Sequence, residues 1–180
     1  MGIATNSVEQ GAALATGSPL LEKARRLGLL RVLDLERLAI ARGCNYYERN
    51  LGQPALPDDA VPLSNAELAI ALIVPAQQPK ARQVRLAAAL LGAADEPAVK
   101  IASVAMEENV AGIVRYIASC GSRFESQNGF WTALLNALPE VAVNRDDLPH
   151  PTRFVEMTGI DRGKVGIFTR WIRAHSRSTA

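Results

Sequence analysis

The stretch Asp95–Gly121, DEPAVKIASVAMEENVAGIVRYIASCG, carries the most regular apolar pattern of the 180-residue chain. Its apolar residues stand three or four positions apart, the spacing of one helical face, and are Val99, Ala102, Met106, Val110, Ile113, Ile117 and Cys120. The pattern predicts one long helix over Glu96–Ser119, the central element of the fold. We expect Ile113 and Ile117 to be almost fully buried, and Arg115 between them to be exposed.

Shorter amphipathic segments precede this stretch. Residues 1–18 lack periodicity and are expected to be a loose or disordered extension. Pro19 stands where a first helical turn accepts proline. The leucines that follow predict one long helix, or two short helices broken near Gly28, with Gly43 as the C-terminal glycine.

Two more helices are expected between Ser64 and Gly92. Ser64 and Glu67 have the spacing of a capping box, in which each side chain binds the backbone amide of the other residue. The helix that they begin should stop before Pro75, because the residue before a proline avoids helical angles. The next helix should start at Pro79 and end at Gly92.

The overall composition favours helices. A last short helix is expected in GFWTALLNALP, capped by Ser126 or Asn128, with an inward face of Phe130, Leu134, Leu135 and Leu138. The chain is 48% hydrophobic and only 5% aromatic. We predict an all-α fold, a compact bundle of five or six helices. A faint echo between VRLAAALLG at Val84 and VRYIASCGS at Val114 is also compatible with repeated helical hairpins.

The expected domains are the extension at 1–18, a helical domain at 19–138, and a linker with a basic tail at 139–180 that docks on the domain. Residues 151–180 contain six basic and two acidic residues, whereas the whole chain has a net charge of only +2. That small charge does not indicate a nucleic-acid or membrane partner. The N-terminus lacks a secretory pattern, and the longest apolar run is far below the ~20 residues of a spanning helix. We expect a cytoplasmic protein.

Few residues are suited to catalysis, cofactors or metals. Cys44 and Cys120 match no metal or redox spacing and are expected to be buried thiols. The only histidines, His150 and His175, lie in or beside the tail. We predict that the protein is not an enzyme and has no cofactor or metal. The alternative is a site assembled in three dimensions and lined by Cys120, Glu107 or His150.

Three structures are open for residues 152–175. The first is a helix over 162–174 that docks on the bundle. The second is a hairpin that pairs RFVEM with KVGIF. The third resembles the helix-turn-helix of DNA-binding proteins over about twenty residues, with a glycine in the turn and apolar anchors in the second helix. The basic residues that this third structure would offer to DNA are Arg162, Lys164 and Arg170.

The function that we predict is an interaction module that binds another protein or a second copy of itself. Aromatic and branched side chains gather among arginines in the tail, a composition enriched in protein interfaces. The candidate partner-binding residues are Phe154, Arg162, Lys164, Phe168, Arg170, Trp171 and Arg173. The alternative function is a DNA-binding regulator that uses the helix-turn-helix-like segment 152–175.

Overall fold

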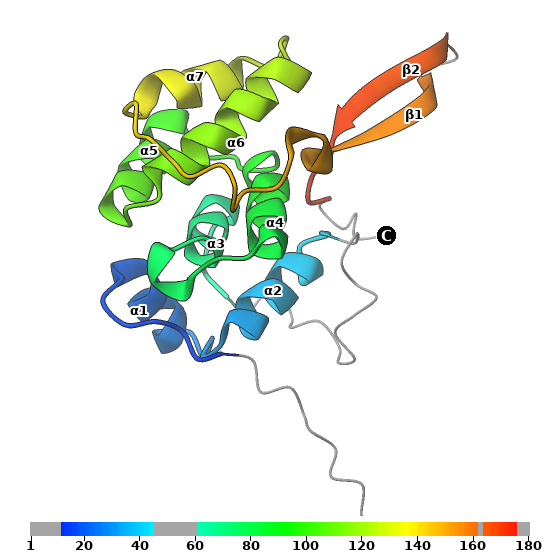
Figure 1. Cartoon of the computed structure of the whole chain (residues 1–180). Coiled ribbons are helices and arrows are strands. Elements are labelled where there is room, and N and C mark those ends of the chain that lie inside the picture. Colours follow the sequence, from blue (N-terminus) through cyan, green and yellow to red (C-terminus); the bar gives the residue numbers. More distant parts are fainter. Residues whose placement is uncertain (1–11, 45–60, 162–163, 176–180) are drawn as a thin grey trace, which may run out of the picture.

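The computed structural model describes residues 12–44, 61–161 and 164–175, which form a mostly helical body and one β hairpin (Figure 1). The α helices are α1 (Pro19–Arg26), α2 (Val32–Ala41), α3 (Asn65–Leu72), α4 (Ala81–Leu91), α5 (Ala98–Glu107), α6 (Ala111–Phe124) and α7 (Gly129–Ala137). The remaining elements are two 3₁₀ helices, η3 (Pro75–Gln77) and η4 (Pro151–Phe154), and the strands β1 (Val155–Asp161) and β2 (Lys164–Trp171). The helical character is as predicted. However, the described residues hold seven α helices, and the hairpin departs from an all-α fold.

Helix α3 is the centre of the helical body. Ala66 and every residue from Leu68 to Leu72 are buried, which is typical of a helix that is covered on all sides. It contacts α1, α2, α4 and α5. In Figure 1 the first two helices lie below α3 and α4, whereas α5, α6 and α7 lie above them. The prediction that the central element lies within Glu96–Ser119 is therefore wrong.

Local sequence signals set most helix boundaries. Two separate helices follow Pro19, and the chain turns at Gly28 and Gly43, with φ angles of +86° and +89°. The capping box at Ser64 is confirmed: its Oγ accepts the Glu67 amide at 3.1 Å, and the Glu67 carboxylate accepts the Ser64 amide at 3.0 Å. Asn128 caps α7 by accepting a backbone amide at 3.1 Å. Each of these expectations follows from a few residues that are neighbours in the sequence.

The expected long helix is in fact two helices, because the chain turns at Asn109. This residue has a left-handed φ of +58°. Its amide donates to the carbonyl of Met106 at 3.1 Å, and the amide of Val110 donates to the carbonyl of Ala105 at 2.8 Å. The two bonds form a Schellman motif, which ends a helix at a residue that tolerates left-handed angles. Helices α5 and α6 therefore differ in direction and cannot share one apolar stripe.

The break brings Glu108 into the protein interior. Its side chain accepts the backbone amide of Leu20 at 2.7 Å and so caps the start of α1. Only 6% of Glu108 is exposed. The inward face of α5 consequently differs from the predicted stripe: Val99 and Met106 are exposed, whereas Ile101 and the alanines of α5 near it are buried.

Two of the three expectations for α6 need correction. Ile117 is fully buried as predicted, but Ile113 is only partly buried. Arg115 is not a free surface residue, because its Nη1 donates to the carbonyls of Leu135 at 2.8 Å and Leu138 at 2.9 Å. These carbonyls lie at the end of α7, where the helix leaves acceptors without intrahelical partners. Arg115 therefore fastens α7 to α6.

The segment just before α1 packs on the body. The amide of Leu14 donates to the carbonyl of Leu30 at 3.0 Å, and the amide of Val32 donates to the carbonyl of Ala12 at 3.1 Å. Leu14 itself is buried. Residues 12–18 thus contact the helical body, although the sequence assigned them to the loose extension. The rest of that extension, residues 1–11, lies outside the described residues.

Candidate functional site

The candidate site is the β hairpin, which leaves the helical body and projects beyond it (Figure 1). β1 and β2 are antiparallel, with Val155 opposite Trp171 at the base and Asp161 opposite Lys164 at the tip. Of the three structures open for this segment, a hairpin is confirmed, while the docked helix and the helix-turn-helix are wrong. The expected pairing of RFVEM with KVGIF is also wrong, because residues 155–157 pair with residues 169–171 and KVGIF pairs with residues 158–161. Three glycines over 159–166 disfavour a helix, and the β-branched and aromatic residues around them favour strands.

Opposite charges face one another near the base of the hairpin. The register places Glu156 opposite Arg170 and Asp161 opposite Lys164. Directly opposed charges of unlike sign stabilise an antiparallel pair. The register shifts within residues 158–160, where the pairing is irregular. Arg170, the basic residue of β2 whose side chain the structure describes, therefore has an acidic residue opposite it.

The base of the hairpin is fixed by a row of packed aromatic rings. Trp171, the last residue of β2, lies between Trp131 of α7 and Phe154 of η4, with ring centroids 4.8 Å and 5.5 Å away. Tyr116 of α6 lies 6.1 Å from the ring of Phe154, and Phe130 lies 5.0 Å from that of Trp131. Both tryptophans and Phe154 are almost completely buried. The row joins the hairpin to α6 and α7 through contacts that stabilise beyond simple burial.

The residues that follow β2 close the C-terminal end of α4. The indole N–H of Trp171 donates to the carbonyl of Ala88 at 3.0 Å. The backbone N–H of Ala174 donates to the carbonyl of Ala89 at 3.0 Å. The Nε–H of Arg173 donates to the carbonyl of Gly92 at 2.8 Å. A Cβ atom on Gly92 would lie 2.7 Å from Trp171 Cδ1, so this close approach requires glycine.

Arg173 also forms a two-point ion pair with Glu125. Its Nη1 lies 2.7 Å from Glu125 Oε1, and its Nη2 contacts Oε2. Oε2 further accepts the indole N–H of Trp131 at 2.8 Å. Burial by itself would raise the pKa of Glu125, but the bonds from Arg173 and Trp131 outweigh burial and lower it. The carboxylate therefore stays charged and links the tail to α6 and α7.

The predicted partner-binding residues divide into internal, exposed and undescribed ones. The side chains of Phe154, Trp171 and Arg173 are engaged inside the protein, as shown above, which leaves them little surface for a partner. Arg170 is exposed on β2. Lys164 and Phe168 lie on β2 with side chains outside the described part, and Arg162 lies outside it altogether. The sequence did not reveal the roles of Glu125 and Trp131, because their partners are distant in the chain.

The groups considered for an enzyme site, all of them described residues, form no hydrogen bond with one another. Cys44 and Cys120 are both buried free thiols. Burial raises the pKa of Cys44 to about 12 and also raises the pKa of Cys120, so neither thiol is activated. Glu107 and His150 are exposed and bind residues of their own segments. These side chains show none of the pairing between a nucleophile and a base that catalysis needs.

Comparisons of the chain with protein-family models, with curated proteins and with solved structures find no match. Within the described ranges, no three His, Cys, Asp or Glu side chains lie close enough together to hold a metal ion. No described helix is long and apolar enough to cross a membrane.

Proposed function

We propose that this chain is a protein-interaction module that binds through the strand edges of its β hairpin. The observation that carries the proposal is the two-stranded sheet itself. Within the part of the chain that the structure describes, β1 and β2 pair only with each other. Each strand therefore has one edge without a neighbouring strand, and such edges accept strands from other chains.

A hairpin of this kind is stabilised by a partner. Two-stranded sheets are marginally stable in water, and three or more strands, or a covering helix, are usually needed. The aromatic row supports only the base, at Phe154, Val155 and Trp171, which are buried. An added strand would supply the missing hydrogen bonds along the rest of the hairpin. The partner is another protein or a second copy of this chain.

The anchored base prepares the hairpin for binding. Because Trp171 and Arg173 hold its second strand to α4 and to Glu125, the hairpin leaves the body in a fixed direction. A fixed binding element loses less entropy when it associates than a free one. Near the base, Met157 is 65% exposed, and a flexible methionine suits an adaptable interface.

The matched charges of the hairpin favour a protein partner over DNA. Nonspecific DNA binding depends on unneutralised basic residues that contact phosphates. Here Arg170 stands opposite Glu156 near the base of the hairpin. DNA binding by the tail remains a sequence-based prediction, and the described part of the tail forms no helix-turn-helix.

Site-specific crosslinking in cells would test the proposal. A photoreactive residue at Met157 should give defined crosslinked products, or a crosslinked dimer with a second copy. The control is the same residue at Val99, which is 73% exposed on α5 but distant from the hairpin in the sequence. Products from Met157 and none from Val99 would support the proposal. Equal labelling at both sites, or none at either, would overturn it.

A hairpin-deleted variant supplies a second test. Residues 157–169 would be replaced by an Asn-Gly turn, which is suited to a short hairpin. The buried residues Phe154, Val155 and Trp171 remain, so the helical circular dichroism should be kept. The purified protein would then be compared with the full chain by light scattering and by crosslinking from an unchanged surface residue. Association that survives the deletion would refute a role for the strand edges.

A further inference from the structure

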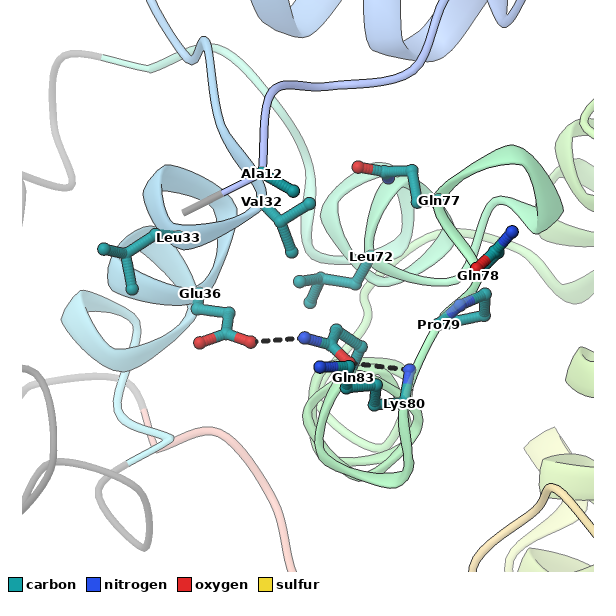
Figure 2. A pocket seen from close by; sticks show the side chains of 10 residues that line it. All are labelled: Ala12, Val32, Leu33, Glu36, Leu72, Gln77, Gln78, Pro79, Lys80 and Gln83. Atoms are coloured by element: carbon teal, nitrogen blue, oxygen red, sulfur yellow. Dashed lines mark hydrogen bonds between the residues drawn. The ribbon is translucent and has the colours of Figure 1, made fainter. Parts of the chain in front are cut away.

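A pocket of about 470 Å³ lies beside the N-terminal end of α4, whereas the hairpin is anchored at the C-terminal end of that helix (Figure 2). Its walls come from α2, the end of α3, η3 and the first turn of α4. The volume is within the usual range of small-molecule sites. Neither the hairpin nor the aromatic row contributes to this pocket, so its role is separate from the proposed protein interaction.

The one carboxylate in the pocket wall is already neutralised. Glu36 is only 6% exposed, and its Oε1 accepts a hydrogen bond from Gln83 Nε2 at 2.6 Å (Figure 2). Its Oε2 lies 3.2 Å from Nε of Arg82. A buried carboxylate with an arginine and an amide on its two oxygens is compensated in charge. Glu36 therefore shapes the wall and leaves little negative charge for a ligand.

The accessible charge in the pocket is the ammonium group of Lys80. This residue is exposed, and its side chain has no hydrogen bond or ion pair with any described residue. Its backbone is fixed, because its amide donates to Gln83 Oε1 at 2.8 Å. Just before it, Gln78 has a left-handed conformation with φ of +49°. Such angles are unfavourable for residues other than glycine and are concentrated at functional sites.

The rest of the wall combines apolar side chains with the amides of Gln77, Gln78 and Gln83. Its apolar part comes from Val32 and Leu33 of α2, the fully buried Leu72 of α3, and Pro79 before α4. In Figure 2 the side chains of Val32 and Leu72 lie between α2 and α4. The pocket thus joins an apolar surface to a single unpaired cation, a combination that fits a molecule with an anionic head and an apolar body.

We propose that this pocket binds a small carboxylic acid with an apolar chain. The carboxylate is held by the Lys80 ammonium, and the chain packs on Val32, Leu33 and Pro79, which are partly exposed in the pocket wall. Carboxylates and ammonium groups form charge-assisted hydrogen bonds, which are stronger than neutral ones. Burial of the chain supplies the hydrophobic contribution.

A neighbouring hollow of about 510 Å³ shares Gln78, Pro79 and Lys80 with the first one. Its wall also contains the carboxylate of Asp147. Asp147 has an oxygen within 3.0 Å of Asn144 but no ion pair with a described residue. This negative charge would repel an anionic ligand in the second hollow. The pocket beside α2 is therefore the favoured site for an anion that binds Lys80.

Calorimetric titration of the full chain with hexanoate tests the proposal. Hexylamine and hexanol have the same apolar chain with a cationic or neutral head. Hexanoate should bind at least about ten-fold more tightly than either of them, the scale of a charge-assisted bond. No measurable hexanoate binding at millimolar concentration, or equal binding of all three compounds, would overturn the proposal.

Lysine variants locate the site. Lys80→Gln should weaken hexanoate binding by about ten-fold or more, whereas Lys80→Arg, which keeps the charge, should weaken it less. The matched control is Lys100→Gln, which changes an exposed lysine of α5 outside this pocket. The hairpin-deleted variant should bind hexanoate as the full chain does, which separates this proposal from the protein interaction. Equal affinity in Lys80→Gln and Lys100→Gln would show that Lys80 does not hold the carboxylate.

Discussion

Replacing Gly121 with alanine should destabilise the protein, although glycine is a poor helix former. In a helix interior alanine is favoured over glycine by about 1 kcal/mol. At Gly121, however, a Cβ atom would lie 2.7 Å from Cγ of the Trp131 indole, well inside the roughly 3.5–4.0 Å contact distance of carbon atoms. Trp131 is completely buried and packs on Trp171 and Phe130, so it has no free space to enter.

The same helix supplies the control. A Cβ atom on Gly112 would meet Val143 Cβ at 3.4 Å, an ordinary contact, so Gly112→Ala should stabilise by up to about 1 kcal/mol. Overpacking a core typically costs about 1–3 kcal/mol. After the gain of about 1 kcal/mol in helix propensity is subtracted, Gly121→Ala should lose up to about 2 kcal/mol. For a chain of this size such a loss lowers Tm by up to roughly 8 °C.

Thermal and urea unfolding of the two variants, followed by circular dichroism, would measure this difference. The two substitutions are identical and lie on one helix, so a propensity effect alone would shift both midpoints upward. We expect shifts of opposite sign. If Gly121→Ala were as stabilising as Gly112→Ala, the close packing of Trp131 on α6, and with it the anchoring of the hairpin base, would be wrong.

Three further predictions concern stability and reactivity. Arg115→Ala should lower the free energy of unfolding in urea by about 1–3 kcal/mol, because two carbonyls at the end of α7 lose their donor. Ile117→Ala should lower it by about 2–5 kcal/mol. A loss below about 0.5 kcal/mol for Arg115→Ala would instead agree with the surface position inferred from sequence. The lowered pKa of Glu125 means that its contribution to stability is present above its ordinary pKa of about 4.3 and is lost as the pH falls through the lower folded value. Urea midpoints should therefore fall less below pH 5 in Glu125→Gln than in the parent. The thiols of Cys44 and Cys120 should react with a disulfide reagent at pH 8 far more slowly in the native state than in urea, and equal rates would contradict their burial.

Short-range signals allowed much of the helical part to be predicted. A capping box at Ser64 and a cap at Asn128 depend on neighbouring residues, and the structure reproduces both. The end of α5 also depends on a local signal, since Asn109 is a residue that accepts left-handed angles. The regular apolar spacing across Asn109 concealed it, because a short break can preserve a three-to-four spacing while the helix changes direction.

The rest depends on contacts between distant parts of the chain. Glu108 is buried because it caps α1, a partner 88 positions away in the sequence. Arg173 binds Glu125 across 48 positions. The spacing of residues along the sequence does not reveal such pairs. The aromatic residues of the tail were therefore assigned to an interface from the composition of the tail alone. In the structure Trp171 instead binds the end of α4 through its indole N–H.

The closure of α4 by residues 171–175 has a consequence for folding during synthesis. Translation delivers α1 to α7 well before Trp171 and Ala174, yet the last turn of α4 lacks these donors until they emerge. Until then the surface of Trp131 that later meets Trp171 is open to water. A nascent helical body with such a patch is prone to misassociate, as incompletely folded chains generally are. Ribosome-bound chains stopped before residue 171 should therefore be more protease-sensitive at α4 and α7 than chains that extend past residue 175.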